Sequence, residues 1–255
     1  FKRCASVALL CLLALPALAL DRPCAIVLLH GKWGGPQPIH LLGRRFEPVC
    51  DYRALEMPWS RRREYDQPYP VALDEIAAQV RALRAQGYVR VLLGGHSFGA
   101  NAALAYMAEV GDVDAVIALA PGHVPERMYR GGIGSAMVDQ ARALVAAGQG
   151  AETLTMDDLN QGQRRSLRMR AAVLLSYFDP QGLGNMPQSA ARFRKAVPLL
   201  WVVGTGDPLY PAGAAFGFER APAHPASKYL VVSADHGSTP EVALPEVLAW
   251  VSALP

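Results

Sequence analysis

The chain has 255 residues, of which 51% are hydrophobic and 18% are charged. This composition is sufficient for one large buried core and argues against a disordered protein. The formal net charge is only +3, which gives no support for a protein that binds nucleic acid. Arginine clusters at 44–45, 61–63 and 164–165 lie in separate segments without interleaved aromatic residues, and we interpret them as solvated loops and helix faces.

The first residues have the pattern of a secretory signal. A basic pair at 2–3 precedes an apolar stretch that ends in an Ala-Leu-Ala box at Ala19, which predicts cleavage after that residue. The apolar stretch, residues 5–20, contains a proline and has 16 residues, fewer than the roughly 20 that span a bilayer. We therefore expect a signal peptide at 1–19, a single domain at 20–255 and a periplasmic or secreted location, without stable membrane insertion.

Beyond the signal, apolar runs typical of strands alternate with segments of helical periodicity. This alternation predicts an α/β fold with a parallel sheet that is covered on both faces. The expected strands are 25–30, 52–57, 90–95, 115–120, 198–204 and 229–233, and the expected helices are 39–46, 73–85, 97–109, 212–219 and 240–254.

A long segment separates the fourth and fifth strands. Residues 138–147 and 166–177 in it have helical spacing, and breakers follow at 148–150 and 179–182. We interpret residues 122–196 as a helical cap insertion over the carboxyl edge of the sheet. Two ordinary covering helices joined by a long loop would have a similar pattern.

The apolar run 89–93 leads directly into Gly95-His96-Ser97-Phe98-Gly99, and a helical stretch follows at once. A G-x-S-x-G serine needs this sequence of strand, sharp turn and helix. The turn exposes the Ser97 hydroxyl, and the new helix offers unpaired N–H groups to a developing negative charge. One such donor is the N–H of Phe98.

Polar residues after two other expected strands, the fifth and the sixth, complete a consistent set. Because ligand sites of open α/β sheets lie beyond the carboxyl ends of the strands, we expect Ser97, Asp207 and His236 to lie together. A serine hydroxyl needs a base to remove its proton, and His236 has nearly the right unperturbed pKa. Asp207 is the candidate acid that holds this histidine in one tautomer.

From Ala25 to Leu254 the chain resembles the α/β-hydrolases. Gly95-His96-Ser97-Phe98-Gly99 matches their nucleophile turn, Asp207 matches the acid beyond the penultimate strand, and His236 matches the base beyond the last strand. The resemblance implies a minimal sheet of about six parallel strands with helices on both faces, without the two leading antiparallel strands of larger members. It also implies an acyl-serine mechanism that needs no organic cofactor.

The same resemblance implies a second oxyanion N–H from the segment His30-Gly31, supplied by Lys32 or Trp33. Trp33 is expected to form a wall of the acyl pocket. The segment 57–66 follows the second strand and also borders the cleft, so Trp59 is a candidate substrate contact. The alternative is a polar loop in which Trp59 covers an edge of the core.

The chain contains other acids and histidines besides these residues. Asp179 in the insertion is the rival acid, because some α/β-hydrolases draw the acid from an earlier strand, and Asp235 is a weaker rival. We interpret His96 and the ring of Phe98 as packing residues, and His40 and His123 as surface or rim residues. No pair of histidines has the spacing of zinc ligands, so no metal is assigned.

The residues therefore predict a serine hydrolase that acts on small-molecule carboxylic esters through Ser97, His236 and Asp207. An acyltransferase or peptidase on the same triad is the alternative enzyme, and a catalytically idle binding protein is the alternative of another class. In the strand order that the resemblance implies, the first two strands are parallel neighbours. Cys24 and Cys50 precede them, and we expect a disulfide between the two.

Overall fold

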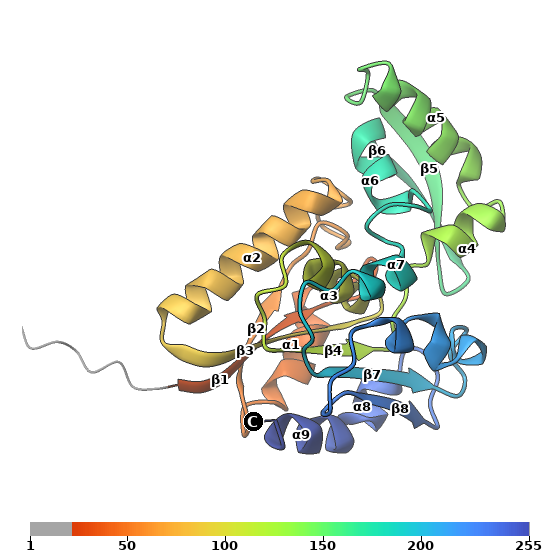
Figure 1. Cartoon of the computed structure of the whole chain (residues 1–255). Coiled ribbons are helices and arrows are strands. Elements are labelled where there is room, and N and C mark those ends of the chain that lie inside the picture. Colours follow the sequence, from red (N-terminus) through yellow and green to blue (C-terminus); the bar gives the residue numbers. More distant parts are fainter. Residues whose placement is uncertain (1–21, 255) are drawn as a thin grey trace, which may run out of the picture.

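The computed structural model describes residues 22–254, and the predicted signal peptide at 1–19 lies outside them. Six parallel strands form the central sheet in the order β2-β1-β3-β4-β7-β8 (Figure 1). All six lie where the apolar runs predict strands. Their bounds are β1 Arg22–Leu29, β2 Asp51–Leu55, β3 Tyr88–His96, β4 Ala115–Leu119, β7 Leu199–Gly204 and β8 Lys228–Val232.

Helices cover both faces of the sheet, because each strand directs alternate apolar side chains to opposite sides. In β1, Ile26 and Leu28 pack in one core with residues of the helices at the carboxyl-terminal end, whereas Val27 and Leu29 belong to the opposite core. The first face is covered by α1 (Pro36–Arg44), α8 (Thr239–Val242) and α9 (Leu244–Ser252), and the second by α2 (Tyr69–Ala85) and α3 (Phe98–Glu109).

The segment between β4 and β7 forms a lobe at the upper right of Figure 1. Its elements are α4 (Pro125–Arg130), α5 (Ser135–Ala146), β5 (Thr153–Asn160), β6 (Gln163–Arg170) and α6 (Ala171–Phe178). The segment then returns to the main body through α7 (Met186–Ala191), which packs against α3. Strands β5 and β6 pair antiparallel in a sheet of their own. The lobe therefore contains a β-hairpin as well as the expected helices.

Two predicted helices differ from the structure. Residues 166–170 are strand and only 171–178 are helix, because Leu167 and Met169 alternate with exposed polar residues and bury one face of the hairpin. The segment 212–219 is a series of short 3₁₀ turns and not one helix, since glycines at 213 and 217 interrupt it.

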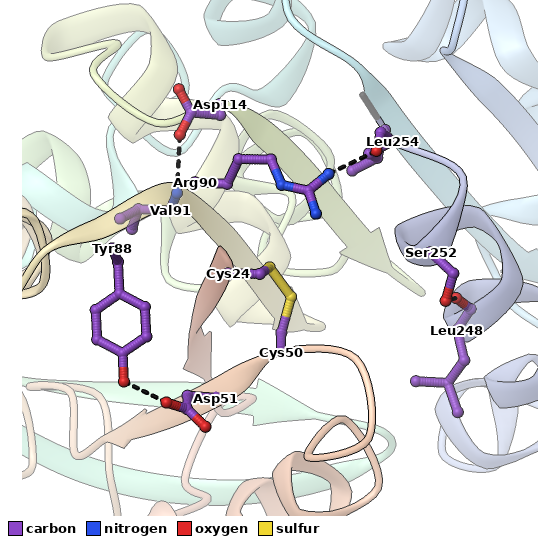
Figure 2. The surroundings of a disulfide bond; sticks show 10 residues. All are labelled: Cys24, Cys50, Asp51, Tyr88, Arg90, Val91, Asp114, Leu248, Ser252 and Leu254. Carbon is purple, nitrogen blue, oxygen red and sulfur yellow. Dashed lines mark hydrogen bonds between the residues drawn. A yellow bond between two sulfur atoms is a disulfide. The ribbon is translucent and has the colours of Figure 1, made fainter. Parts of the chain in front are cut away.

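Cys24 and Cys50 form the expected disulfide (Figure 2). Ala25 of β1 lies opposite Asp51 of β2 in the parallel register, so the residues just before them face each other, with Cα atoms 4.7 Å apart. Both cysteines are buried, and the bond lies at the amino edge of the sheet. Among residues 22–254, no helix is long and apolar enough to cross a membrane.

Candidate active site

Ser97 lies between the end of β3 and the first residue of α3, in a backbone conformation that side chains rarely adopt. Its φ is 56° and its ψ is −116°, which is the strained turn that a nucleophile of this kind requires. Backbone hydrogen bonds to the end of β4 and to the segment after it hold Ser97 in this conformation. The Ser97 N–H donates to Leu119 O at 3.0 Å, and the Ser97 carbonyl accepts from Gly122 N at 3.1 Å. The hydroxyl is therefore fixed at the carboxyl end of β3.

Glycines make room around this turn. A Cβ added to Gly95 would overlap the backbone of Gly99, so helix and strand can approach closely only without one. At Gly122 an added Cβ would lie 2.6 Å from Ser97 Oγ and 3.2 Å from His236 Cε1. The close approach of strand and helix therefore depends on Gly95, and the space beside the serine hydroxyl depends on Gly122.

The structure brings Ser97, His236 and Asp207 into one hydrogen-bonded chain. The Nδ1 of His236 lies 2.6 Å from Asp207 Oδ2, and its Nε2 lies 2.9 Å from Ser97 Oγ. Because a carboxylate can only accept, Nδ1 carries the proton, and Nε2 of the neutral ring accepts from the serine hydroxyl. The Asp207 side chain is 1% exposed and that of His236 is 14% exposed, so the pair is shielded and the histidine still reaches the cleft.

Asp207 is held in place from its own loop, whereas the rival acids lie elsewhere. Its second oxygen, Oδ1, accepts from Leu209 N at 2.7 Å. Asp179 accepts from Arg142 at 3.3 Å and from Gln181 N at 3.1 Å. Asp235 accepts from the backbone N–H and the hydroxyl of one residue of its own turn, Ser238. Of the three acids, only Asp207 contacts the His236 ring.

His96 has a role that the sequence interpretation missed. Its Nε2 lies 2.9 Å from the carbonyl oxygen of His236, and because a carbonyl can only accept, Nε2 is the donor. Burial lowers the pKa of His96 to about 4, which keeps the ring neutral near pH 7. His96 thus fixes the backbone on which His236 is carried, and only its position beside Ser97 in sequence hinted at this.

His123 is also a buried residue and not a rim residue as expected. Its ring stacks on Phe98 with centroids 3.9 Å apart, and its Nε2 donates to Tyr177 O at 2.8 Å. Burial lowers the pKa of His123 well below its usual value. His40, by contrast, lies on the exposed face of α1, where its Nδ1 forms a hydrogen bond of 2.8 Å with Tyr52 Oη.

Two backbone N–H groups beside Ser97 have no acceptor among the described residues. They belong to Phe98, the first residue of α3, and to Lys32, in the loop after β1. The loop lies against the serine, since a Cβ added to Gly31 would be 3.1 Å from Ser97 Cβ. Trp33 is not a second candidate donor, because its N–H donates to Trp59 O at 2.9 Å.

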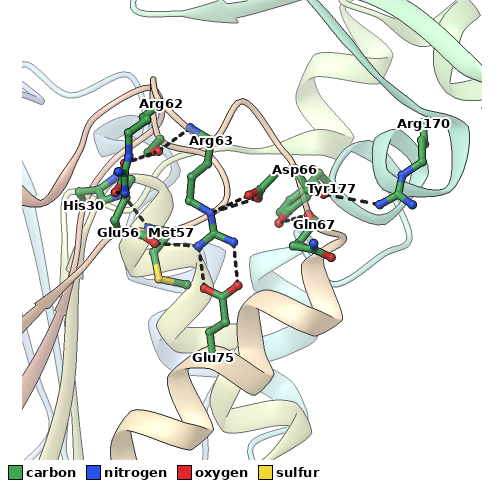
Figure 3. A network of polar contacts seen from close by, with 11 residues as sticks. His30, Glu56, Met57, Arg62, Arg63, Asp66, Gln67, Glu75, Arg170 and Tyr177 are labelled. Carbon is green, nitrogen blue, oxygen red and sulfur yellow. Dashed lines mark hydrogen bonds and ion pairs between the residues drawn. The ribbon is translucent and has the colours of Figure 1, made fainter.

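The loop after β2 braces the loop after β1. His30 Nε2 accepts from Met57 N at 3.0 Å, and His30 O accepts from Trp59 Nε1 at 2.9 Å. Arg63 anchors the bracing loop on α2 through two hydrogen bonds of 2.7 Å to Glu75 (Figure 3). The loop beside Ser97 is therefore fixed by a network that extends to the second layer of helices.

Trp33 and Trp59 lie outside the cavities at Ser97, in contrast to the substrate contacts expected of them. Trp59 is fully buried and stacks on Phe98 with ring centroids 4.5 Å apart. Trp33 is 7% exposed, and Arg165 covers its ring at 5.5 Å. Both indoles support the loop that carries Lys32. For Trp59 this agrees with the alternative interpretation, in which it covers an edge of the core.

Two cavities open on either side of Ser97. One has a volume of about 680 Å³ and is lined by α1 residues such as Ile39 and Leu42. The other has a volume of about 310 Å³ and is lined by apolar side chains, which include Met128 and Ile133, together with polar ones. Ser97, Lys32, Asn160 and Gln161 line both cavities, so the tip of the β5–β6 hairpin separates them above the serine. A molecule bound at Ser97 could extend in two directions.

The described residues, 22–254, contain no group of three or more His, Cys, Asp or Glu side chains placed to hold a metal ion. They do contain a serine hydroxyl, a histidine nitrogen in hydrogen-bond contact with it, a carboxylate behind the histidine and two N–H groups without an acceptor among these residues. Such a set can form and break an acyl-serine.

Comparisons with known proteins agree with this architecture. Over 91% of the chain, the fold matches a monoacylglycerol lipase of Paleococcus ferrophilus (TM-score 0.65, 19% identity, 96% of that chain covered). It likewise matches a thermostable carboxyl esterase of Bacillus coagulans (TM-score 0.62, 12% identity, 91% and 92% of the two chains covered). Est1E of Butyrivibrio proteoclasticus is a third such structure (TM-score 0.58, 15% identity, 91% and 87% covered). At these identities the similarity shows the fold alone.

A comparison with curated proteins gave no match. The model of one protein family, described as the alpha/beta hydrolase family, matches residues 26–249, which includes every strand of the central sheet except the start of β1. By that match, and by the sheet and turn described above, the chain belongs to the alpha/beta hydrolase family.

Proposed function

We propose that the protein is a serine hydrolase that cleaves carboxylic esters of small molecules, with Ser97 as nucleophile, His236 as base and Asp207 as acid. The observation that carries this proposal is the continuous chain of hydrogen bonds from Asp207 through His236 to Ser97 Oγ, at 2.6 and 2.9 Å. The esterases and lipases among the structural neighbours support ester hydrolysis as the reaction type.

In the first half of the reaction, His236 Nε2 takes the hydroxyl proton as Ser97 Oγ attacks the ester carbonyl. Asp207 stabilises the imidazolium that forms, and the N–H groups of Phe98 and Lys32 donate to the developing oxyanion. The imidazolium then gives its proton to the departing alcohol, which leaves an acyl-serine.

In the second half, His236 takes a proton from a water molecule as the water attacks the acyl-serine. The bond between the acyl group and Ser97 Oγ then breaks, the imidazolium returns the proton to Oγ, and the carboxylic acid leaves. The two cavities suit an ester with a group on each side of the reacting carbonyl. We propose that residues 122–196 act as a cap over these cavities, because the hairpin tip at Asn160 and Gln161 lines both.

The test is Ser97→Ala, measured on p-nitrophenyl esters of graded acyl length. Removing the nucleophile of such a unit lowers kcat on the order of 10³-fold or more, while the melting temperature stays close to that of the wild type. A fluorophosphonate probe should label wild-type protein once per chain, at Ser97, and leave Ser97→Ala unlabelled. Retained turnover in Ser97→Ala would refute the mechanism, and an unreactive wild-type protein would favour an idle binding protein.

We also propose that the protein works in the periplasm or outside the cell after cleavage near Ala19. The Cys24–Cys50 disulfide supports this, because such bonds persist in oxidising compartments. Mass spectrometry of the natural protein should find Leu20 as the first residue and the two cysteines joined. An uncleaved chain in which Cys24 and Cys50 are both free thiols would contradict both parts of the proposal.

A further inference from the structure

A buried ion pair joins the loop after β1 to the hairpin of the lobe. The Nζ of Lys32 donates to Asp158 Oδ1 at 2.7 Å and to Leu159 O at 3.2 Å. The Lys32 and Asp158 side chains are 3% and 0% exposed, although 126 residues separate them in sequence. Removing two charges from water costs free energy that their attraction does not reliably return, so the stability of the fold is a weak explanation for the pair.

The hairpin also holds the Lys32 backbone. Asn160 Nδ2 donates to Lys32 O at 3.2 Å, and Asp158 is itself fixed by Tyr65 Oη at 3.2 Å and by Leu159 N at 2.8 Å. Lys32 is therefore restrained by the hairpin at its ammonium and at its carbonyl.

The one polar backbone group of Lys32 that no described residue uses is its N–H, beside Ser97. The residue that follows is fixed independently, since Trp33 N donates to Trp59 O at 2.9 Å. The direction of the free N–H thus depends on the positions of the Lys32 ammonium and carbonyl, and both of these groups are held by the hairpin.

We propose that Asp158 is a positioning residue for the oxyanion site, which through the Lys32 side chain holds the Lys32 N–H toward the substrate carbonyl. This inference rests on the proposed function, because it needs an oxyanion at Ser97. The loop and the lobe are then parts of one site, and the hairpin contributes to the rate of the reaction without touching the reacting atoms.

Loss of the Asp158 charge leaves the Lys32 ammonium buried without a counter-ion, which is strongly unfavourable. The loop shifts to relieve this, and its N–H moves from the oxyanion. Losing an oxyanion donor outright costs about 10²- to 10³-fold in kcat, so a displaced donor is expected to cost roughly 10- to 100-fold. Ground-state binding in the two cavities is unchanged, and KM stays within about threefold of wild type.

The experiment compares Asp158→Asn, Lys32→Met and the double variant Lys32→Met/Asp158→Leu on p-nitrophenyl butyrate. Each single variant should lower kcat by the stated factor. The double variant should be as slow as the slower single variant and not slower, because the two residues act as one unit. The matched control is Glu64→Gln, which removes another hairpin ion pair, Arg165 to Glu64 at 2.6 Å, without touching Lys32, and should keep wild-type kcat.

A second measurement separates positioning from general damage. A propyl trifluoromethyl ketone forms a serine adduct whose oxyanion needs both N–H groups, whereas the matching methyl ketone scarcely forms one. Asp158→Asn should weaken inhibition by the trifluoromethyl ketone in proportion to the loss of kcat and leave inhibition by the methyl ketone unchanged. Equal weakening of both would overturn the proposal.

Wild-type kcat in folded Asp158→Asn or in the folded double variant would also overturn it. If Asp158→Asn fails to fold, the double variant decides, and failure of all three variants to fold would assign the pair to stability instead. Failure of the proposed function gives a different result, because wild-type protein would then not react with a fluorophosphonate. If wild-type and Asp158→Asn proteins react with the fluorophosphonate equally fast, only the present inference fails.

Discussion

At the scale of single residues, the acid behind His236 is the assignment with a direct competitor. Asp207→Asn should lower kcat on the order of 10³- to 10⁴-fold, because an amide in its place favours the wrong tautomer of His236. Asp179→Asn is the matched control and should leave kcat unchanged, since Asp179 contacts Arg142 and its own turn. Steady-state kinetics of both variants on one ester checks this, and the opposite ranking would transfer the acid role to Asp179.

Buried histidines make the stability of the protein depend on pH. Burial lowers the pKa of His96 to about 4, and it also lowers the pKa of His30 and that of His123. Between pH 6.5 and 4 the unfolded chain binds a proton at His96 and the folded chain does not, so stability falls as the pH falls through this range. The lowered pKa values of His30 and His123 act in the same direction. For His96 alone the full loss is about 3 kcal/mol.

Urea unfolding at pH 7.5, 6.5 and 5.5 tests this expectation. The midpoint should fall with pH, and it should fall less steeply in His96→Gln, which has one buried histidine fewer. Equal midpoints at the three pH values would contradict the prediction, and so would identical slopes in the two proteins.

How far the sequence predicts the site differs from residue to residue. The positions of Ser97, Asp207 and His236 follow from strand ends, because parallel strands bring their carboxyl ends to one edge. The partner of Lys32 could not be found in this way, since no local pattern relates it to a residue of the inserted hairpin. For Trp59 the strand-end rule predicted too much. Its position after β2 suggested a substrate contact at the cleft, but its side chain packs inward on Phe98.

At the scale of elements, the loop after β2 is held by one arginine. Arg63 donates to Glu75 at 2.7 Å, to Glu56 O at 2.8 Å and to Asp66 at 3.0 Å, and its hydrogen bond to Glu75 raises its pKa above the ordinary value. Arg63→Met should destabilise the protein by about 1 to 3 kcal/mol, the usual contribution of hydrogen bonds to charged groups.

Arg62→Ala is the matched control for Arg63→Met. The neighbouring Arg62 pairs with Glu56, but its side chain is 79% exposed, and exposed ion pairs contribute little. Thermal and urea unfolding of the two variants should therefore separate them clearly. Equal losses of stability would show that the network in Figure 3 does not anchor the loop.

The hairpin is the element that periodicity alone did not predict. Its two-residue turn places Gln161 at a φ of 48° and Gly162 at 78°, which is the geometry that joins two antiparallel strands tightly. The apolar residues of β6 alternate over only a few positions before α6 begins, so a window across 166–177 has a mixed period. A helix that starts where a strand ends is hard to separate from it by spacing.

At the scale of the whole molecule, the carboxyl and amino edges of the sheet carry different kinds of residues. The carboxyl edge carries Ser97 and its partners, whereas the amino edge carries the disulfide and the hydrogen bond from Arg90 to Leu254 O (Figure 2). This polarity follows from the parallel direction of the strands, which the sequence predicts through the alternation of strand and helix. The sequence predicted α5 in the segment between β4 and β7 but not the β5–β6 hairpin, because an insertion is not constrained by the sheet.

The disulfide should therefore affect stability and not turnover. Cys24→Ser/Cys50→Ser is expected to lose roughly 3 kcal/mol of stability, from the entropy that the bond removes from the unfolded chain. Its kcat should equal that of the wild type. Urea unfolding and ester kinetics on the same sample check both statements, and a lower kcat in a folded double variant would contradict the separation of the two edges.

Burial of the disulfide also makes it a natural reporter of native-state opening. Cys24 and Cys50 are each 3% exposed, so a small thiol in solution has no path to either sulfur atom while β1 and β2 stay paired. Exchange must wait until this margin of the sheet separates. The time course of reduction under native conditions would therefore record how often the first two strands part, and with no added label.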